Sequence, residues 1–269
     1  MNGAMVPSGG WQTLDAKGGV VLRTAGQGAP LVVFPGMEGD GQSCLHMALP
    51  VWNDLANTRE RQLVLVDYAE EQHPTLSALI ETLIELFGNL SGPALSFWGQ
   101  SFGNLLAASI AAADVLPVDR VALVSPFTQL PKVTQAATVP LSITPAALYK
   151  ITTPTVGRWI FGPVDGNLDH PFFASLAAMA PVTVARRAGW LRGQRFVDPF
   201  LQIQAPVKVW LGERDRLIEL DDERPFFEAL TRRRSDQFTM VPGSGHVALP
   251  ARSVELLRRE ISAWLSERD

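Results

Sequence analysis

The chain has 269 residues, of which 46% are hydrophobic and 19% are charged, and its formal net charge is −4. This mildly acidic balance gives no electrostatic reason to expect a nucleic acid or an acidic membrane surface as partner. Cys44 is the only cysteine, which excludes an internal disulfide. The N-terminal residues do not resemble a signal peptide, and the most apolar stretch, LLAASIAAADVL, is too short to span a bilayer. We therefore expect a cytoplasmic protein without a membrane span.

Short apolar runs indicate the strands of a central sheet. A continuous apolar run is typical of a strand that is buried on both faces. Such runs are LVVF at residues 31–34, QLVLVDY at 62–68, DRVALVS at 119–125 and PVKVWLG at 206–212. A β-rich run also precedes the first of these, across a Gly-Gln-Gly turn, and DQFTMV at 236–241 is the last predicted strand.

Helical patterns lie between these runs. The segment TLSALIETLIELFGNL has apolar residues at helical spacing and ends at Gly88 and Asn89, which are typical of a helix C-terminus. The C-terminal segment SVELLRREISAWLSERD is amphipathic, with Ser253 as its expected N-cap. Alternating strands and helices predict an α/β fold with a mostly parallel central sheet that is flanked by helices.

One region interrupts this alternation. Residues 127–196 contain seven prolines and short helical pieces but no clear strand. We interpret this region as a helical cap inserted between strands, because the sheet needs strands from both sides of it. The predicted core then consists of residues 1–126 and 197–269.

The stretch WGQSFG at residues 98–103 places a serine between two glycines. It follows a buried run and precedes a helical pattern that starts near Asn104. Gly99 and Gly103 allow the tight turn that projects the Ser101 hydroxyl at the C-terminal edge of the sheet. We expect Ser101 to be a nucleophile. The alternative is an ordinary turn whose serine only caps the following helix.

A serine nucleophile needs a base and an acid that orients the base. Of the four histidines, His246 stands in GSGHVALP, directly after the last predicted strand. A loop that leaves this edge can bring His246 to Ser101, although an exposed loop histidine is the alternative. In the segment LGERDRL, Asp215 lies deeper in its loop than Glu213, which we expect to be a solvated neighbour. We therefore predict Asp215 as the acid.

An oxyanion hole requires backbone N–H donors beside the serine. The residue after the nucleophile, Phe102, is expected to supply one donor. The second donor is expected in FPGMEGDG at residues 34–41, where three glycines let the backbone approach a ligand closely. Met37 is the predicted second donor, and Glu38 is the next candidate.

The motifs FPGMEGDG, WGQSFGN, LGERDRL and GSGHVALP resemble the oxyanion loop, nucleophile elbow, acid loop and histidine loop of the α/β-hydrolase superfamily. The order Ser, Asp, His is the one expected of that superfamily. Many members carry His-Gly where this chain has Pro35-Gly36, and AEEQHP replaces the common Gly-x-Gly-x-Ser turn. Both features look like thioesterases and related esterases with a Pro-Gly-x-x-Gly-x-Gly loop.

The cap is rich in large apolar side chains, which suggests an apolar chamber over Ser101. The residues expected to line this substrate pocket are Glu38, Trp159, Phe172, Phe173 and Trp190. Arg186 and Arg187 could meet a substrate carboxylate or phosphate, but we interpret them as a solvated helix face.

These features predict a serine hydrolase that cleaves an ester or thioester with a hydrophobic acyl or alcohol part. Its substrate is a small molecule, and an acyl carrier or coenzyme A thioester is one candidate. No metal or organic cofactor is expected, because the sequence contains no clustered ligand set and no phosphate-binding glycine loop. The alternatives are an acyltransferase, a lyase or peroxidase of the same fold, and a binding module without catalysis.

Overall fold

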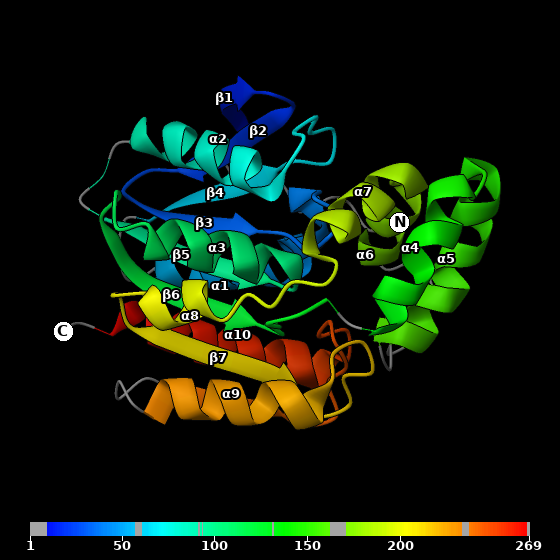
Figure 1. Ribbon diagram of the computed structural model, residues 1–269. Coiled ribbons are helices and arrows are strands. Elements are labelled where there is room, and N and C mark those ends of the chain that lie inside the picture. The colour runs from blue at the N-terminus through cyan, green and yellow to red at the C-terminus, as the bar shows by residue number, and fades with distance from the viewer. Residues whose placement is uncertain are drawn as a thin grey trace.

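The computed structural model describes residues 10–56, 61–90, 92, 94–130, 132–161, 171–232 and 237–267. Its centre is an eight-stranded sheet with the order β1-β2-β4-β3-β5-β6-β7-β8 (Figure 1). The strands are β1 (Gln12–Lys17), β2 (Val20–Gly26), β3 (Ala29–Phe34), β4 (Arg61–Asp67), β5 (Leu95–Gln100), β6 (Val118–Val124), β7 (Val207–Gly212) and β8 (Gln237–Val241). The pairs β1–β2 and β2–β4 are antiparallel, and all the other pairs are parallel.

Helices cover both faces of the sheet, which confirms the predicted fold class. One face packs against α2 (Leu76–Gly88), α3 (Phe102–Ala112), α8 (Asp198–Gln202) and α9 (Leu220–Arg232). The other face packs against α1 (Leu45–Ala56), which follows a short 3-10 helix, η1 (Gly41–Cys44), and against α10 (Ala251–Ser266). The strands supply alternate residues to the two sides: Val32 and Phe34 face the first group, and Leu31 and Val33 face the second.

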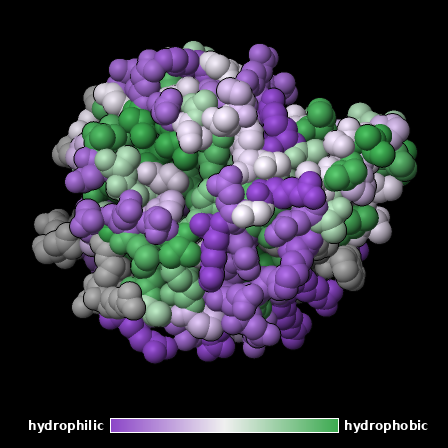
Figure 2. All heavy atoms as spheres, in the orientation of Figure 1, coloured by the Kyte–Doolittle hydropathy of each residue, from purple (hydrophilic) through white to green (hydrophobic). Residues whose placement is uncertain are grey.

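The helical cap lies between β6 and β7 in the chain. It contains α4 (Lys132–Ile143), α5 (Ala146–Phe161), α6 (Pro171–Ala178) and α7 (Pro181–Leu191), which gather beside one end of the sheet (Figure 1). Gln129 and Arg195 form an antiparallel bridge, so the segments that enter and leave the cap run together. Figure 2 shows hydrophobic side chains over the outer part of the cap, where Val139, Ile143 and Ile151 are exposed.

Three element boundaries differ from the predictions. The edge strand β1 was not expected. Helix α3 begins at Phe102, directly after Ser101, whereas the sequence predicted a start near Asn104. Ser253 is not an N-cap: α10 begins at Ala251 after Pro250, and the buried Ser253 hydroxyl reaches the Pro242 carbonyl at 3.5 Å. The helix extends upstream because Ala and Arg at its first two positions favour helix. Within the described ranges, no helix has the length and apolar character needed to cross a membrane.

Candidate active site

Ser101 occupies the sharp turn between β5 and α3. Its backbone has φ 53° and ψ −121°, a conformation that is rare for residues other than glycine and is typically held by its surroundings. The Ser101 N–H donates to the Val124 carbonyl at 3.0 Å. The buried Asn104 amide donates to the carbonyls of Ser101 and Val124 at 3.0 and 2.7 Å, and its oxygen accepts from the Val124 N–H. The strained turn is therefore tied to β6 on both sides of the serine.

Two glycines make this turn possible because they leave no side chain in its way. A Cβ atom at Gly103 would lie 2.3 Å from the Pro35 carbonyl oxygen and 2.4 Å from that of Phe34. A Cβ atom at Gly99 would lie 2.6 Å from the Asn104 Cα. The turn and the segment after β3 therefore approach each other at backbone distance, as the predicted oxyanion site requires.

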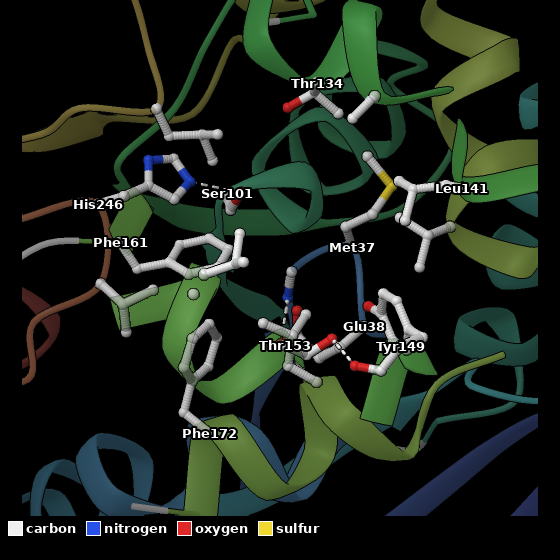
Figure 3. Close-up of a pocket in the computed structure, with 18 of the residues that line it drawn as sticks. Met37, Glu38, Ser101, Thr134, Leu141, Tyr149, Thr153, Phe161, Phe172 and His246 are labelled. Atoms are coloured by element: carbon white, nitrogen blue, oxygen red, sulfur yellow. Dashed lines mark hydrogen bonds between the residues drawn. The ribbon is translucent and has the colours of Figure 1, made fainter. Parts of the chain in front are cut away.

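His246 and Asp215 form a hydrogen-bonded chain with Ser101. The His246 Nε2 lies 2.7 Å from the Ser101 Oγ (Figure 3). The His246 Nδ1 lies 2.7 Å from the Asp215 Oδ2. Both the imidazole and the carboxylate are buried. The second Asp215 oxygen accepts from the N–H groups of Leu217 and Ile218 at 2.9 and 3.2 Å, which fixes the plane of the carboxylate. This arrangement favours the tautomer with the proton on Nδ1 and leaves Nε2 free to accept from the serine.

The neighbouring carboxylate Glu213 and two of the other three histidines have partners other than Ser101. Glu213 is exposed and accepts from the Gly243 N–H at 2.9 Å. His46 contacts the carbonyls of Ser43 and Ala248, and His73 contacts Thr82. His170 lies outside the described residues.

The segment after β3 lies against the serine turn, and each of the two carries one predicted oxyanion donor. Among the described residues, neither the Met37 N–H nor the Phe102 N–H has a hydrogen-bond acceptor. The close contact of Gly103 with Pro35 brings the two segments together. Two unpaired donors on adjoining segments are the arrangement that can bind an oxyanion.

Glu38 is buried beside this segment. One carboxylate oxygen accepts from the Gly36 N–H at 3.1 Å and from the Ser43 hydroxyl at 2.5 Å. Burial raises the pKa of the Glu38 carboxyl above its ordinary value. The side chain therefore helps to shape the loop and also places a carboxyl group in the wall of the cavity described next.

A cavity of about 270 Å³ opens over Ser101, between the core and the cap (Figure 3). Of the residues predicted from the sequence, Met37, Glu38, Ser101, Phe172 and His246 line it. Its wall also contains two of the large apolar cap residues that suggested the chamber, Tyr149 and Phe161. The other cap residues in the wall were not predicted: Thr134, Ala137, Leu141, Thr144, Thr152, Thr153, Val156, Gly157, Leu176 and Val184. Several of these are threonines or small apolar residues, which carry no sequence signal for a pocket.

Two predicted pocket residues, Phe173 and Trp190, are not brought to this cavity. Phe173 is buried and packs beside Phe172 and Leu176 without reaching the cavity surface. The Trp190 indole donates to the Pro74 carbonyl at 3.1 Å and lies against Arg186. The side chain of Trp159 lies outside the described part of the structure.

The interpretation of Arg186 and Arg187 as a solvated helix face is wrong for Arg187. Its side chain is completely buried, whereas that of Arg186 is 36% exposed. Both guanidinium groups contact the buried Glu71 carboxylate. A buried guanidinium is tolerated because this carboxylate and nearby carbonyl oxygens satisfy it.

Cys44 is buried, burial raises the pKa of its thiol, and the thiol donates to Gln100 at 3.3 Å. In the part of the chain that the structure describes, no three His, Cys, Asp or Glu side chains are grouped as metal ligands.

Solved structures share this fold at low sequence identity. A hydrolase from Pseudomonas aeruginosa has a TM-score of 0.75 at 16% identity, covering 97% of this chain and 100% of that one. An esterase from Exiguobacterium antarcticum has a TM-score of 0.72 at 15% identity, with 97% and 98% coverage. A bromoperoxidase from Bacillus anthracis has a TM-score of 0.73 at 12% identity, with 92% and 96% coverage. These similarities support the fold and not one reaction.

The sequence itself gives a family match of nearly full length. No curated protein sequence matches the chain. A model of the alpha/beta hydrolase family, however, matches residues 2–259. Because this match spans nearly the whole chain and the sheet with its flanking helices agrees with it, the chain belongs to the alpha/beta hydrolase family.

Proposed function

We propose that the protein hydrolyses a carboxylic ester or thioester through an acyl-enzyme on Ser101. The observation that carries this proposal is the hydrogen-bonded chain from Ser101 through His246 to Asp215, which opens into a largely apolar cavity. A serine hydroxyl is a weak nucleophile until a neighbouring base removes its proton. His246 Nε2 stands at hydrogen-bond distance for this step.

Acylation follows from the geometry of these groups. As the Ser101 Oγ attacks the substrate carbonyl carbon, its proton passes to His246 Nε2. The carbonyl π electrons move to oxygen, and the N–H groups of Met37 and Phe102 stabilise the oxyanion. The tetrahedral intermediate collapses when its C–O or C–S bond breaks and His246 returns the proton to the leaving alcohol or thiol.

Deacylation repeats these steps with water. His246 takes a proton from water as the water oxygen attacks the acyl carbon, and it then protonates Ser101 as the acid product leaves. Asp215 holds the Nδ1–H tautomer and stabilises the imidazolium that forms in both halves of the reaction. The N–H groups of Leu217 and Ile218 keep this carboxylate in place.

The cavity favours a substrate with a small or medium-sized apolar part. Its volume of about 270 Å³ is near the lower end of ligand pockets, which range from about 300 to 1,000 Å³. An acyl chain can occupy the space between Leu141, Phe161 and Phe172. The carrier part of a coenzyme A or acyl-carrier thioester would remain outside this cavity.

A chain-length series tests the proposal. Wild type is expected to hydrolyse p-nitrophenyl esters and the matching thioesters, assayed from acetyl to dodecanoyl, with a maximum at a short or medium chain. Ser101→Ala is expected to lose on the order of a millionfold in kcat while its circular dichroism and melting temperature stay close to wild type. Wild-type protein without turnover on the whole series, or an active Ser101→Ala, would contradict the proposal. Product analysis with added alcohol distinguishes hydrolysis from acyl transfer.

A further inference from the structure

We infer that Tyr68 and Arg187 are positioning residues that hold the Met37 N–H toward Ser101, so that the helical cap completes the oxyanion site. This inference rests on the proposed function. Tyr68 directly follows β4, and Arg187 belongs to α7 of the cap. Their hydrogen bonds converge on the two peptide units that flank the Met37 Cα.

Tyr68 fixes the first of these peptide units. Its hydroxyl donates to the Gly36 carbonyl at 2.7 Å and shares the same proton with the Pro35 carbonyl at 2.5 Å. The Gly36 C=O and the Met37 N–H belong to one planar trans peptide unit, so they point in opposite directions. A hydroxyl that holds the carbonyl on one side therefore directs the N–H to the other side.

Arg187 fixes the second peptide unit. Its Nη1 donates to the Met37 carbonyl, and its Nη2 donates to the Tyr68 carbonyl. The guanidinium also lies over the Tyr68 ring, with its carbon 5.0 Å from the ring centroid. With both flanking peptide units held, the backbone of Met37 has little freedom to rotate.

The surroundings are shaped for this guanidinium. Gly39 has a φ of +71°, and a Cβ atom there would lie 2.6 Å from the Tyr68 ring and 2.8 Å from the Arg187 Nη1. Glu71, whose side chain is completely buried, accepts from the Arg187 Nε at 3.3 Å and balances its charge. A side chain at position 39 or a missing carboxylate would displace the guanidinium.

Arg186 provides a matched comparison on the same helix. Its Nη2 donates to the Glu71 carboxylate at 2.6 Å and to the Glu71 carbonyl at 2.7 Å. No hydrogen bond joins it to residues 35–39 among the described residues. Loss of Arg186 therefore perturbs the Glu71 network without releasing Met37, whereas loss of Arg187 does both.

The experiment compares wild type with Tyr68→Phe, Arg187→Met and Arg186→Met. An alkylboronic acid forms a tetrahedral adduct with an active serine and places an oxygen in the oxyanion site, so its Ki reports the alignment of the donors. The carboxylic acid product makes no such adduct, and its Ki reports only the cavity. A donor displaced by about 1 Å can cost on the order of a hundredfold in rate.

We expect Tyr68→Phe and Arg187→Met to lower kcat by about ten- to a hundredfold with little change in KM. The boronic acid Ki is expected to rise by a similar factor, while the Ki of the carboxylic acid stays near wild type. Arg186→Met is expected to keep both inhibition constants. If Arg187→Met does not fold, Tyr68→Phe carries the test, because it keeps the ring and the Arg187–Glu71 pair in place.

Two results would overturn the inference. One is an unchanged boronic acid Ki in folded Tyr68→Phe and, if it folds, in Arg187→Met. The other is an equal loss in Arg186→Met, which would indicate a general effect of the Glu71 network. A failure of the proposed function can be distinguished from a failure of this inference. In that case wild type itself would neither hydrolyse the esters nor bind the boronic acid.

Discussion

Two nearby carboxylates, Asp215 and Glu213, are the candidates for the acid that orients His246. Asp215 contacts the imidazole at 2.7 Å, whereas Glu213 is exposed and accepts from Gly243. Asp215→Asn is expected to lower kcat by up to about ten-thousandfold, because the amide favours the wrong imidazole tautomer. Glu213→Gln is the matched control and is expected to change kcat little in the same ester assay. The reverse pattern would contradict the assignment of the acid.

The buried Glu38 carboxyl is expected to make the free energy of unfolding depend on pH. Burial raises the pKa of its carboxyl in the folded state, so the folded protein retains this proton to a higher pH than the unfolded chain. Its contribution to stability is therefore complete below the unfolded pKa and is lost as pH rises through the folded pKa. Glu38→Gln stays neutral throughout. Urea unfolding is measured at pH values from the unfolded to the folded pKa of Glu38. As pH rises, the free energy of unfolding of wild type is expected to fall relative to that of Glu38→Gln. A difference that stays constant with pH would contradict this expectation.

The positions of some site residues could be predicted from the sequence, and those of others could not. Ser101, Asp215 and His246 stand in short motifs just after predicted strands, and they do lie in one hydrogen-bonded chain, although their catalytic roles remain predictions. The buried position of Arg187 could not be predicted, because arginine is usually exposed and its partner Met37 lies 150 residues away. Partners so distant in sequence leave no local pattern.

The turn between β5 and α3 leaves no room for a side chain at position 103. A Cβ atom at Gly103 would meet the Pro35 and Phe34 carbonyl oxygens, so Gly103→Ala must push the segment after β3 away from Ser101. We expect a loss of about 1–3 kcal/mol in stability, as in other overpacked sites, together with a lower kcat.

Gly189 in α7 is the control for this substitution, because nothing lies within 4 Å of the position of its Cβ atom. Gly189→Ala is expected to stabilise the protein by about 0.5–1 kcal/mol through helix propensity, with kcat unchanged. Chemical denaturation and the ester assay measure both variants. A Gly103→Ala protein as stable and active as Gly189→Ala would show that the close approach does not matter.

Secondary-structure elements were predictable where their apolar residues are consecutive or periodic. The buried strands β3, β4, β6 and β7 occur where such runs indicate them. Helix starts were less predictable, because several residues near a start can cap it and local propensity decides among them, as at Ser253. The exposed edge strand β1 has no continuous apolar run and so gave no clear signal.

If the cavity between core and cap holds the acyl chain, the size of the cavity sets the preferred chain length. Leu141 on α4 lines this cavity, so Leu141→Ala enlarges it and is expected to shift the preferred acyl chain toward greater length. Leu148 on α5 does not line the cavity and is 52% exposed, which makes Leu148→Ala the control in the same cap. The chain-length series measures both. An identical shift in the two variants would argue against an acyl chain in this cavity.

The architecture of the core was more predictable than that of the cap. Strand and helix alternation is enough to indicate a parallel sheet covered on both faces. The cap helices have mixed polar and apolar faces, and their arrangement depends on contacts of α4 with α7 and of α5 with α6. The boundaries of the cap and the likeness to thioesterases remain predictions.

Mass spectrometry after fluorophosphonate treatment identifies directly which residue is the nucleophile. The reagent phosphonylates an activated serine, and peptide mapping locates the adduct. If Ser101 is the nucleophile, wild type is expected to carry a single adduct on Ser101, and Ser101→Ala is expected to carry none. An adduct on another residue, or an unmodified wild-type Ser101 under conditions that label a known serine hydrolase, would contradict it.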